Sequence, residues 1–251
     1  MKKNHTPSVR SQGYSLLELV LVIAIIAVLV GLLLPKGFDA LRNARVQQVQ
    51  KTVDTLKTSL TDYISTAGGN GSIPRTEGTG IPTSGAALTG ATDAAKGNAS
   101  RLDTVLLATG KIERPLALRM GTQAFVSTGT GNEVTWSQAS LGFVMTPDAA
   151  PQRNWSTVTR AEARTANPAL APSAALGANF RLDGVTNISA NYVVAYLVIP
   201  ACPAKDAYEL AVAMNGAQLA PVEGAASETG VVAYAAPANG VTDVYVYLTA
   251  L

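Results

Sequence analysis

The chain of 251 residues is 47% hydrophobic and only 14% charged, which is too apolar for intrinsic disorder and long enough for a sizeable core. Its formal net charge is +2, but without Lys2, Lys3 and Arg10, which precede Gly13, 16 basic and 17 acidic residues remain. This balance gives no electrostatic reason to expect nucleic acid as a partner.

An apolar segment follows the basic leader. Leu16–Leu34 contains a single charged residue, Glu18, and as a helix it would be about 28 Å long, close to the thickness of a bilayer's hydrocarbon core. A secretory signal would have a shorter apolar core and a small-residue cleavage site, and the other alternative is a buried core helix. We predict a transmembrane helix. Basic residues lie on both sides of it, so charge does not decide its orientation.

The helical pattern continues after the apolar segment. Pro35 and Gly37 predict a kink rather than a break, and Gly68 with Gly69 ends the pattern. The sequence therefore predicts one long helix over residues 14–67, transmembrane over 14–35 and amphipathic over 36–67. The apolar stripe of the second half, which needs a surface to lie on, consists of Phe38, Leu41, Val46, Val49, Val53, Leu56, Leu60 and Ile64.

The remaining residues, 68–251, predict a globular α+β head. Loops are predicted over residues 67–99, rich in Gly, Thr, Ser and Ala, and over 165–178, rich in Ala and Pro. A short helix begins at Ser100–Asp103 and ends at Gly110, with Leu102, Val105 and Leu106 facing inward. Further segments are strands at 124–127, 134–136, 141–145, 192–199, 231–236 and 241–248, a turn at 129–132, and a helix at 203–215.

The last predicted strand has two different faces. Val244, Val246 and Leu248 alternate with Tyr245 and Tyr247, so the two sets project to opposite sides of a sheet. Because residues 231–236 and 241–248 flank the turn-forming segment 237–240, we expect them to pair as a hairpin.

Residues that carry most enzyme chemistry are scarce. The only histidine, His5, lies in the leader, and the only cysteine is Cys202, so a chain without its leader has no histidine-based triad and no multi-thiolate zinc site. Cys202 is either a small core residue, which we expect, or an unpaired thiol that links two chains. Asp183, Asp206 and Asp243 are scattered, and we expect them in solvent. We predict no catalytic residues, cofactor or metal, and hence no enzyme.

The segment Gly13-Tyr14-Ser15-Leu16-Leu17-Glu18, followed by the apolar run, resembles the processing site of type IV prepilins and type II secretion pseudopilins. The likeness covers about 25 residues: a short basic leader ending in Gly13, Glu18 as the fifth residue after the cut, and Pro35 as the twenty-second. In that family a membrane aspartic peptidase, the prepilin peptidase, cuts after the glycine and methylates the new amine. The resemblance therefore implies cleavage between Gly13 and Tyr14 and N-methylation of Tyr14, although the family usually has Phe or Met there.

The resemblance also implies a fold and a function. The fold would be pilin-like, with the amphipathic half of the helix packed on an antiparallel β-sheet of the head. The apolar half would form the core of a helical filament, and Glu18 and Pro35 would serve assembly, Glu18 by pairing with the Tyr14 amine of a neighbouring subunit. Implied partners are prepilin peptidase, other copies of the chain or related subunits, the membrane, and the assembly platform, ATPase and secretin machinery.

Two functions of different classes follow. The first is a filament subunit, made as a single-pass inner-membrane precursor with its head in the periplasm and then assembled into an extracellular pilus or a periplasmic pseudopilus. The size of the head favours a pilin. The second is a membrane-tethered extracytoplasmic binding protein or enzyme that uses the N-terminus only as an anchor. Cleavage after Gly13 distinguishes the two, because a tethered enzyme has no need of prepilin peptidase.

Overall fold

The computed structural model describes residues 16–66, 71–76, 102–113, 116, 118–121, 134–139, 142–147, 159–174 and 178–251. The chain divides into two compact units, Met1–Asn43 and Ala44–Leu251, and each is described by itself. Gly13, Tyr14, the predicted strand at 124–127 and the predicted turn at 129–132 lie outside the described residues.

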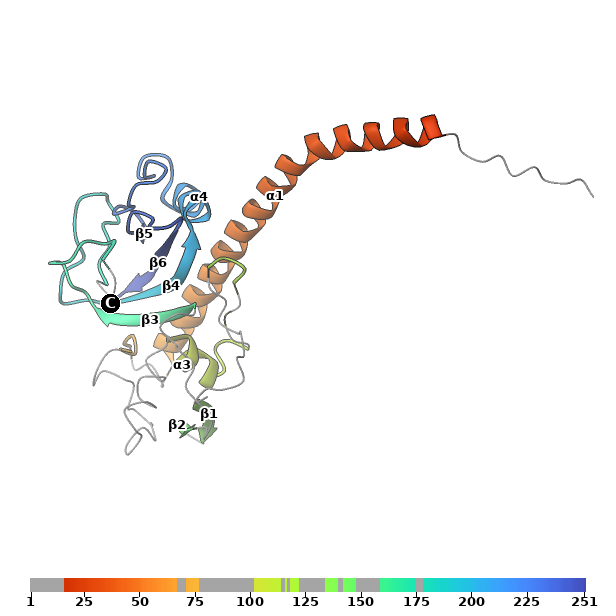
Figure 1. Ribbon diagram of the computed structural model, residues 1–251. Helices are drawn as coiled ribbons and strands as arrows, with labels where there is room; N and C mark the ends of the chain where they lie inside the picture. Colours follow the sequence, from red (N-terminus) through yellow and green to blue (C-terminus); the bar gives the residue numbers. More distant parts are fainter. Residues whose placement is uncertain are drawn as a thin grey trace, which may run out of the picture. The chain divides into compact units, whose positions relative to one another are not determined.

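The long helix predicted from the apolar and amphipathic patterns is present. Helix α1 (Leu16–Ser65) runs without interruption for 50 residues (Figure 1). It continues through Pro35 and Gly37 without a break, as predicted. The predicted ends of the helix at residues 14 and 67 lie outside the described residues.

The second unit contains an antiparallel sheet of four strands (Figure 1). The strands lie in the order β3 (Arg160–Thr165), β4 (Val193–Pro203), β6 (Val241–Ala250) and β5 (Val232–Tyr234). Strands β1 (Val134–Ala139) and β2 (Gly142–Pro147) form a separate antiparallel pair. Two short helices complete these elements, α3 (Leu102–Ala108) and α4 (Ala204–Asn215). The predicted α+β layout, with a long N-terminal helix and an antiparallel sheet, is confirmed.

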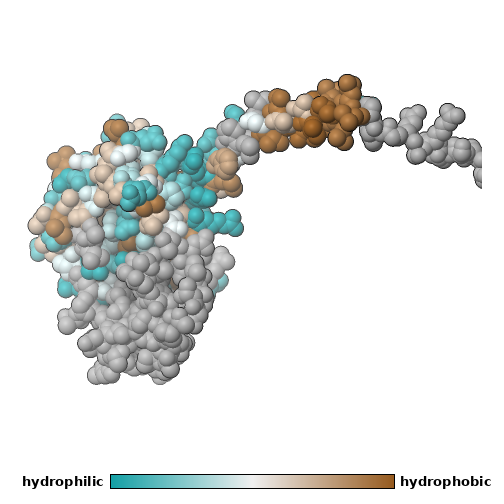
Figure 2. All heavy atoms as spheres, in the orientation of Figure 1, coloured by the Kyte–Doolittle hydropathy of each residue, from teal (hydrophilic) through white to brown (hydrophobic). Residues whose placement is uncertain are grey.

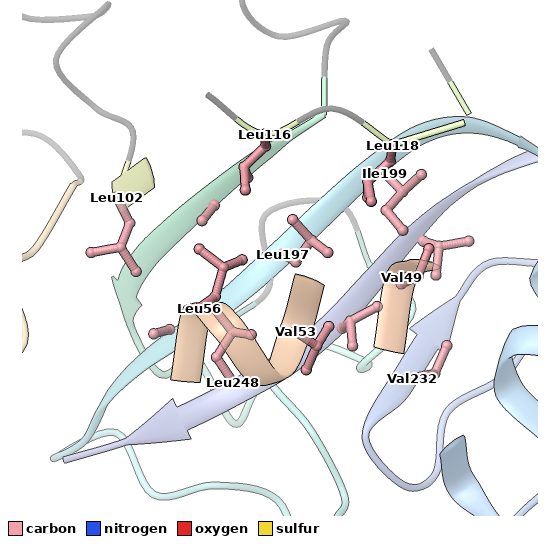
Figure 3. Packing of buried hydrophobic residues seen from close by; sticks show 14 of the residues in the cluster. Val49, Val53, Leu56, Leu102, Leu116, Leu118, Leu197, Ile199, Val232 and Leu248 are labelled. Atoms are coloured by element: carbon pink, nitrogen blue, oxygen red, sulfur yellow. The ribbon is translucent and has the colours of Figure 1, made fainter. Parts of the chain in front are cut away.

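One face of the sheet packs against the second half of α1. Figure 3 shows Val49, Val53 and Leu56 of the helix beside Leu197 and Leu248 of the sheet. All five side chains are buried, and burying each contributes about 1.5–3 kcal/mol. This contact supplies the surface that the amphipathic pattern required.

The predicted stripe on α1 is only partly correct. Its members from Val46 to Leu60 are buried, Ile64 is half-buried, and Tyr63, which the prediction omitted, is buried as well. Phe38 and Leu41, however, are 59% and 57% exposed. The packed part of the stripe therefore begins at Val46 rather than at Phe38.

The opposite face of the sheet is buried by residues of the segment that follows β3. Phe180 contacts Tyr247 edge-on, with ring centroids 5.5 Å apart, and Tyr196 contacts Tyr245 in the same way at 6.1 Å. The predicted alternation in β6 is confirmed, because its aliphatic residues face α1 and its tyrosines face away from it. Both faces of this sheet are thus buried.

The strand prediction needs correction at β3, β4 and β5. Strand β3 was not predicted, although its final residue begins the predicted loop. Strand β4 extends to Pro203 rather than Ile199, because an irregularity between Ile199 and Cys202 accommodates Ala201 at φ +49° before pairing resumes. Strand β5 is shorter than predicted, with only Val232–Tyr234 paired to β6.

Candidate membrane and assembly segment

The first half of α1 presents an apolar surface. Every large apolar side chain from Leu16 to Val30 is between 46% and 81% exposed. Figure 2 shows this stretch as a nearly continuous hydrophobic surface. Leaving each such side chain in water costs about 1.5–3 kcal/mol relative to an apolar environment. By length and composition the helix is apolar enough to cross a membrane.

Glu18 interrupts this surface close to its start. It lies in the first turn of α1, where the positive end of the helix dipole favours an acidic side chain. At the end of a membrane span a carboxylate also lies nearer to the interface than it would at the bilayer centre, which lowers its cost. The position of Glu18 is therefore compatible with a membrane segment.

The structure places Glu18 and Pro35 on the same unbroken helix. They are 17 residues apart, which corresponds to about 26 Å of helix. These two residues thus lie near opposite ends of the apolar segment. The other two predicted site residues, Gly13 and Tyr14, lie outside the described residues.

Polar contacts tie the packed half of α1 to the segment that follows α3. The Ser59 hydroxyl donates a hydrogen bond of 3.0 Å to the Lys111 carbonyl oxygen, and the Lys111 ammonium lies 2.7 Å from the Asp62 carboxylate. Three turns before Ser59 on α1, the Gln48 side-chain oxygen accepts a hydrogen bond of 3.3 Å from the Arg119 backbone N–H. These contacts, together with the apolar stripe, hold residues 46–64 in the second unit.

An ion pair joins α1 to α4 at the point where the packed half of α1 begins. Arg45 Nη1 lies 3.0 Å from Asp206 Oδ2, and only 3% of the Asp206 side chain is exposed. Asp206 is in the first turn of α4, so the helix dipole adds to the stabilisation. The expectation that Asp206 lies in solvent is wrong, whereas Asp183 and Asp243 are exposed as expected.

Glu162 is a second buried carboxylate, and the sequence analysis did not predict it. Glu162 on β3 accepts hydrogen bonds from Arg160 Nε, from Arg164 Nε at 2.8 Å and from the Tyr196 hydroxyl at 2.9 Å. Burial alone would raise the pKa of Glu162, but the charges and hydrogen bonds of Arg160 and Arg164 outweigh it and lower that pKa. Burial, followed by the Glu162 charge, raises the pKa of Tyr196. The cluster is an ionised carboxylate held between two guanidinium groups.

Cys202 is fully buried and free, as the core-residue interpretation predicts. Burial, followed by the nearby Asp206 charge, raises the pKa of its thiol. The neutral thiol therefore predominates at physiological pH, and a protonated thiol is a poor nucleophile. In the part of the chain that the structure describes, no group of three or more His, Cys, Asp or Glu side chains is arranged to hold a metal ion.

Comparison of the chain with protein-family models, with curated proteins and with solved structures finds no match.

Proposed function

We propose that this chain is a structural subunit of a type IV pilus or of a related secretion pseudopilus. One observation carries the proposal: a single unbroken helix has a first half that is apolar and exposed and a second half that is built into a folded head. A filament with a helical core needs this division. One half of the helix must contact other copies, and the other half must carry the head.

The apolar half would have two environments in succession. In the precursor, Leu16–Val30 would lie in the hydrocarbon core of the inner membrane. In the filament, the apolar helices of other copies would replace the lipid, so the exposed apolar surface would remain out of water throughout. Contacts between different surfaces of successive copies repeat without closing and generate a helical assembly.

Processing would create a cation that can pair with Glu18 between copies. Cleavage after Gly13 would create a cationic amine at Tyr14, four residues before Glu18 along the chain. In an apolar bundle an unpaired charge is strongly destabilising, whereas a pair with good geometry is tolerated. Pairing between the Glu18 carboxylate of one copy and the Tyr14 amine of the next would therefore fix the axial position of each new subunit.

Mass spectrometry of the N-terminal peptide tests the proposal directly. The chain would be isolated from the membrane fraction and from sheared surface filaments of its native host. We expect a peptide that starts at N-methylated Tyr14, and we expect a Gly13→Val variant to retain the leader. A chain that keeps Met1 in a host with active prepilin peptidase would overturn the proposal in favour of a membrane-tethered protein.

A further inference from the structure

Two loops of the head that contact each other both carry exposed apolar side chains. Among the described residues of the second unit, Val185 and Val222 are the most exposed large hydrophobic residues, at 81% and 77%. Leu182 lies in the first loop and Leu219 in the second, and we call these four side chains the loop patch. The loops are in contact, since a Cβ atom added at Gly184 would lie only 2.8 Å from Cδ2 of Leu219.

Hydrogen bonds hold the first loop in one conformation. The Asp183 carboxylate accepts from the backbone N–H groups of Val185 at 2.9 Å and Thr186 at 2.7 Å. The Arg181 carbonyl oxygen accepts from the Gly230 N–H at 2.8 Å, which joins this loop to the segment that precedes β5.

The second loop is held in a similar way. The Thr229 hydroxyl donates to the Leu219 carbonyl oxygen at 3.1 Å, and the Ala225 N–H donates to the Val222 carbonyl oxygen at 3.0 Å. A surface that is already ordered loses little conformational entropy when a partner binds. The loop patch is thus preorganised for binding.

The two loops that carry the loop patch have a net negative charge. Residues 178–191 and 216–230 contain three acidic residues, Asp183, Glu223 and Glu228, and one basic residue, Arg181. Arg181 lies 3.4 Å from Glu228, whereas Asp183 and Glu223 are exposed. A partner that fits this surface would have an apolar centre and basic residues around it.

The chain itself has such a surface on α1. Phe38 and Leu41 are spaced as i and i+3, so they are neighbours on the helix surface, and both are more than half exposed. They lie beyond the stretch that matches the hydrocarbon thickness of a bilayer. The charged residues of the segment 31–43 are Lys36, Asp39 and Arg42. Arg42 Nη1 lies 3.2 Å from Asp39 Oδ1, so the net positive charge of the segment comes from Lys36.

We propose that the loop patch of one copy binds the Phe38–Leu41 surface of a second copy. The inference rests on the proposed filament function and specifies one of its contacts. Apolar side chains would meet at the centre, and Asp183 and Glu223 would face the basic residues around Phe38 and Leu41. The two surfaces differ, so each copy can bind one neighbour on either side, and the contact extends the assembly instead of closing it.

Photo-crosslinking in assembled filaments tests the contact. Benzoylphenylalanine would replace Val222, and as a matched control it would replace Val212, an exposed apolar residue on α4. We expect irradiation of the Val222 variant to give a crosslinked dimer in which residue 222 is joined to the tryptic peptide Gly37–Arg42. The Val212 variant should not give this product. If filaments form but residue 222 is crosslinked only to other peptides, or only within its own chain, the proposed contact is wrong. The filament function would still stand.

Charge exchange provides an independent test. Glu223→Lys and Lys36→Glu each place like charges across the contact, and we expect each to reduce the amount of filament at least about five-fold. The double variant should restore assembly, because the charges are then opposite again. N-methylated Tyr14 in all three variants would show that membrane insertion and processing are unaffected. Lack of restoration in processed chains overturns the contact, whereas chains that retain Met1 and never form filaments overturn the filament function and the contact with it.

Discussion

Arg45 of α1 donates a hydrogen bond to the buried carboxylate of Asp206 in the first turn of α4, although 161 residues separate the two in the sequence. The pair lies next to Val46, the first buried residue of the apolar stripe. It therefore fixes the N-terminal end of the packed segment of α1 to α4.

Replacement of Arg45 by glutamine should destabilise the second unit. The change leaves the Asp206 carboxylate buried without its guanidinium partner, and we expect a loss of about 1–3 kcal/mol, because Arg45 itself is partly exposed to water. Urea denaturation of the full chain in detergent micelles measures the effect. Lys51→Gln, an exposed change on the same helix, is the control and should alter the unfolding midpoint little. Equal midpoints for the two variants would contradict the anchoring role.

Glu162 should make the second unit sensitive to acid. Its pKa is lowered in the folded protein, so its contribution to stability is complete above its ordinary value of 4.5 and is lost as the pH falls through the lower folded value. Urea denaturation as a function of pH should therefore show stability decreasing below pH 4.5. The Glu162→Gln variant should be about 3 kcal/mol less stable at pH 7 and should have a weaker pH dependence in this acidic range.

The exposed Glu223 provides the matched control for this measurement. A Glu223→Gln variant should keep the stability at pH 7 and the acid dependence of the unchanged protein. If Glu162→Gln also kept the stability at pH 7 and the acid dependence, the ion pairs of Glu162 with Arg160 and Arg164 would not contribute to the stability of the second unit.

The sequence predicts those elements whose residue pattern is strong. Helix α1, helix α4 and the two faces of β6 follow from periodic apolar residues, and such patterns persist because each repeat buries the same side of the element. Strand β3 also alternates, with Ala161 and Ala163 buried on one face, but its other face carries the buried Arg160 and Glu162 and the half-buried Arg164. Three charged residues at alternate positions are typical of a solvent-exposed face, and the local sequence does not show that Tyr196 and the aromatic side chains of the second cluster cover this face.

The candidate site was also only partly predictable from the sequence. The apolar surface of Leu16–Val30 and the position of Glu18 follow from the sequence alone, because they depend on residues that are adjacent along one helix. The burial of Asp206 depends on Arg45, and the loop patch depends on Gly184 meeting Leu219, residues that are distant in sequence. Local patterns contain no information about such contacts.

Leu56 and Leu41 provide a matched pair on α1. Leu56 is fully buried against the sheet, so Leu56→Ala should leave a cavity and destabilise the second unit by about 2–5 kcal/mol. Leu41 is exposed, so Leu41→Ala should leave the urea midpoint nearly unchanged. If the proposed contact between copies is correct, Leu41→Ala should instead reduce the yield of sheared filaments. A large loss of stability in Leu41→Ala would contradict the assignment of Leu41 to a surface outside the head core.

The Cys202 thiol should react only after the second unit unfolds. It is fully buried, and burial raises its pKa, so both access and thiolate concentration are low in the folded protein. Alkylation by iodoacetamide, followed by mass spectrometry across a urea series, should rise in parallel with the unfolding transition. Rapid alkylation in the absence of urea, or a disulfide-linked dimer in purified filaments, would show instead that the cysteine is accessible.

Replacement of Glu18 by alanine should separate processing from assembly. The prepilin peptidase cuts after Gly13, five residues away, so we expect the N-methylated Tyr14 peptide to remain largely unchanged. Assembly should fail, because the Tyr14 amine would then be an unpaired cation among apolar helices, a situation that costs about 3–5 kcal/mol. Val20→Ala, which trims an exposed apolar residue of the same segment, is the control and should still assemble. Normal filaments from Glu18→Ala would rule out the charge pair as the element that fixes the axial position of the subunits.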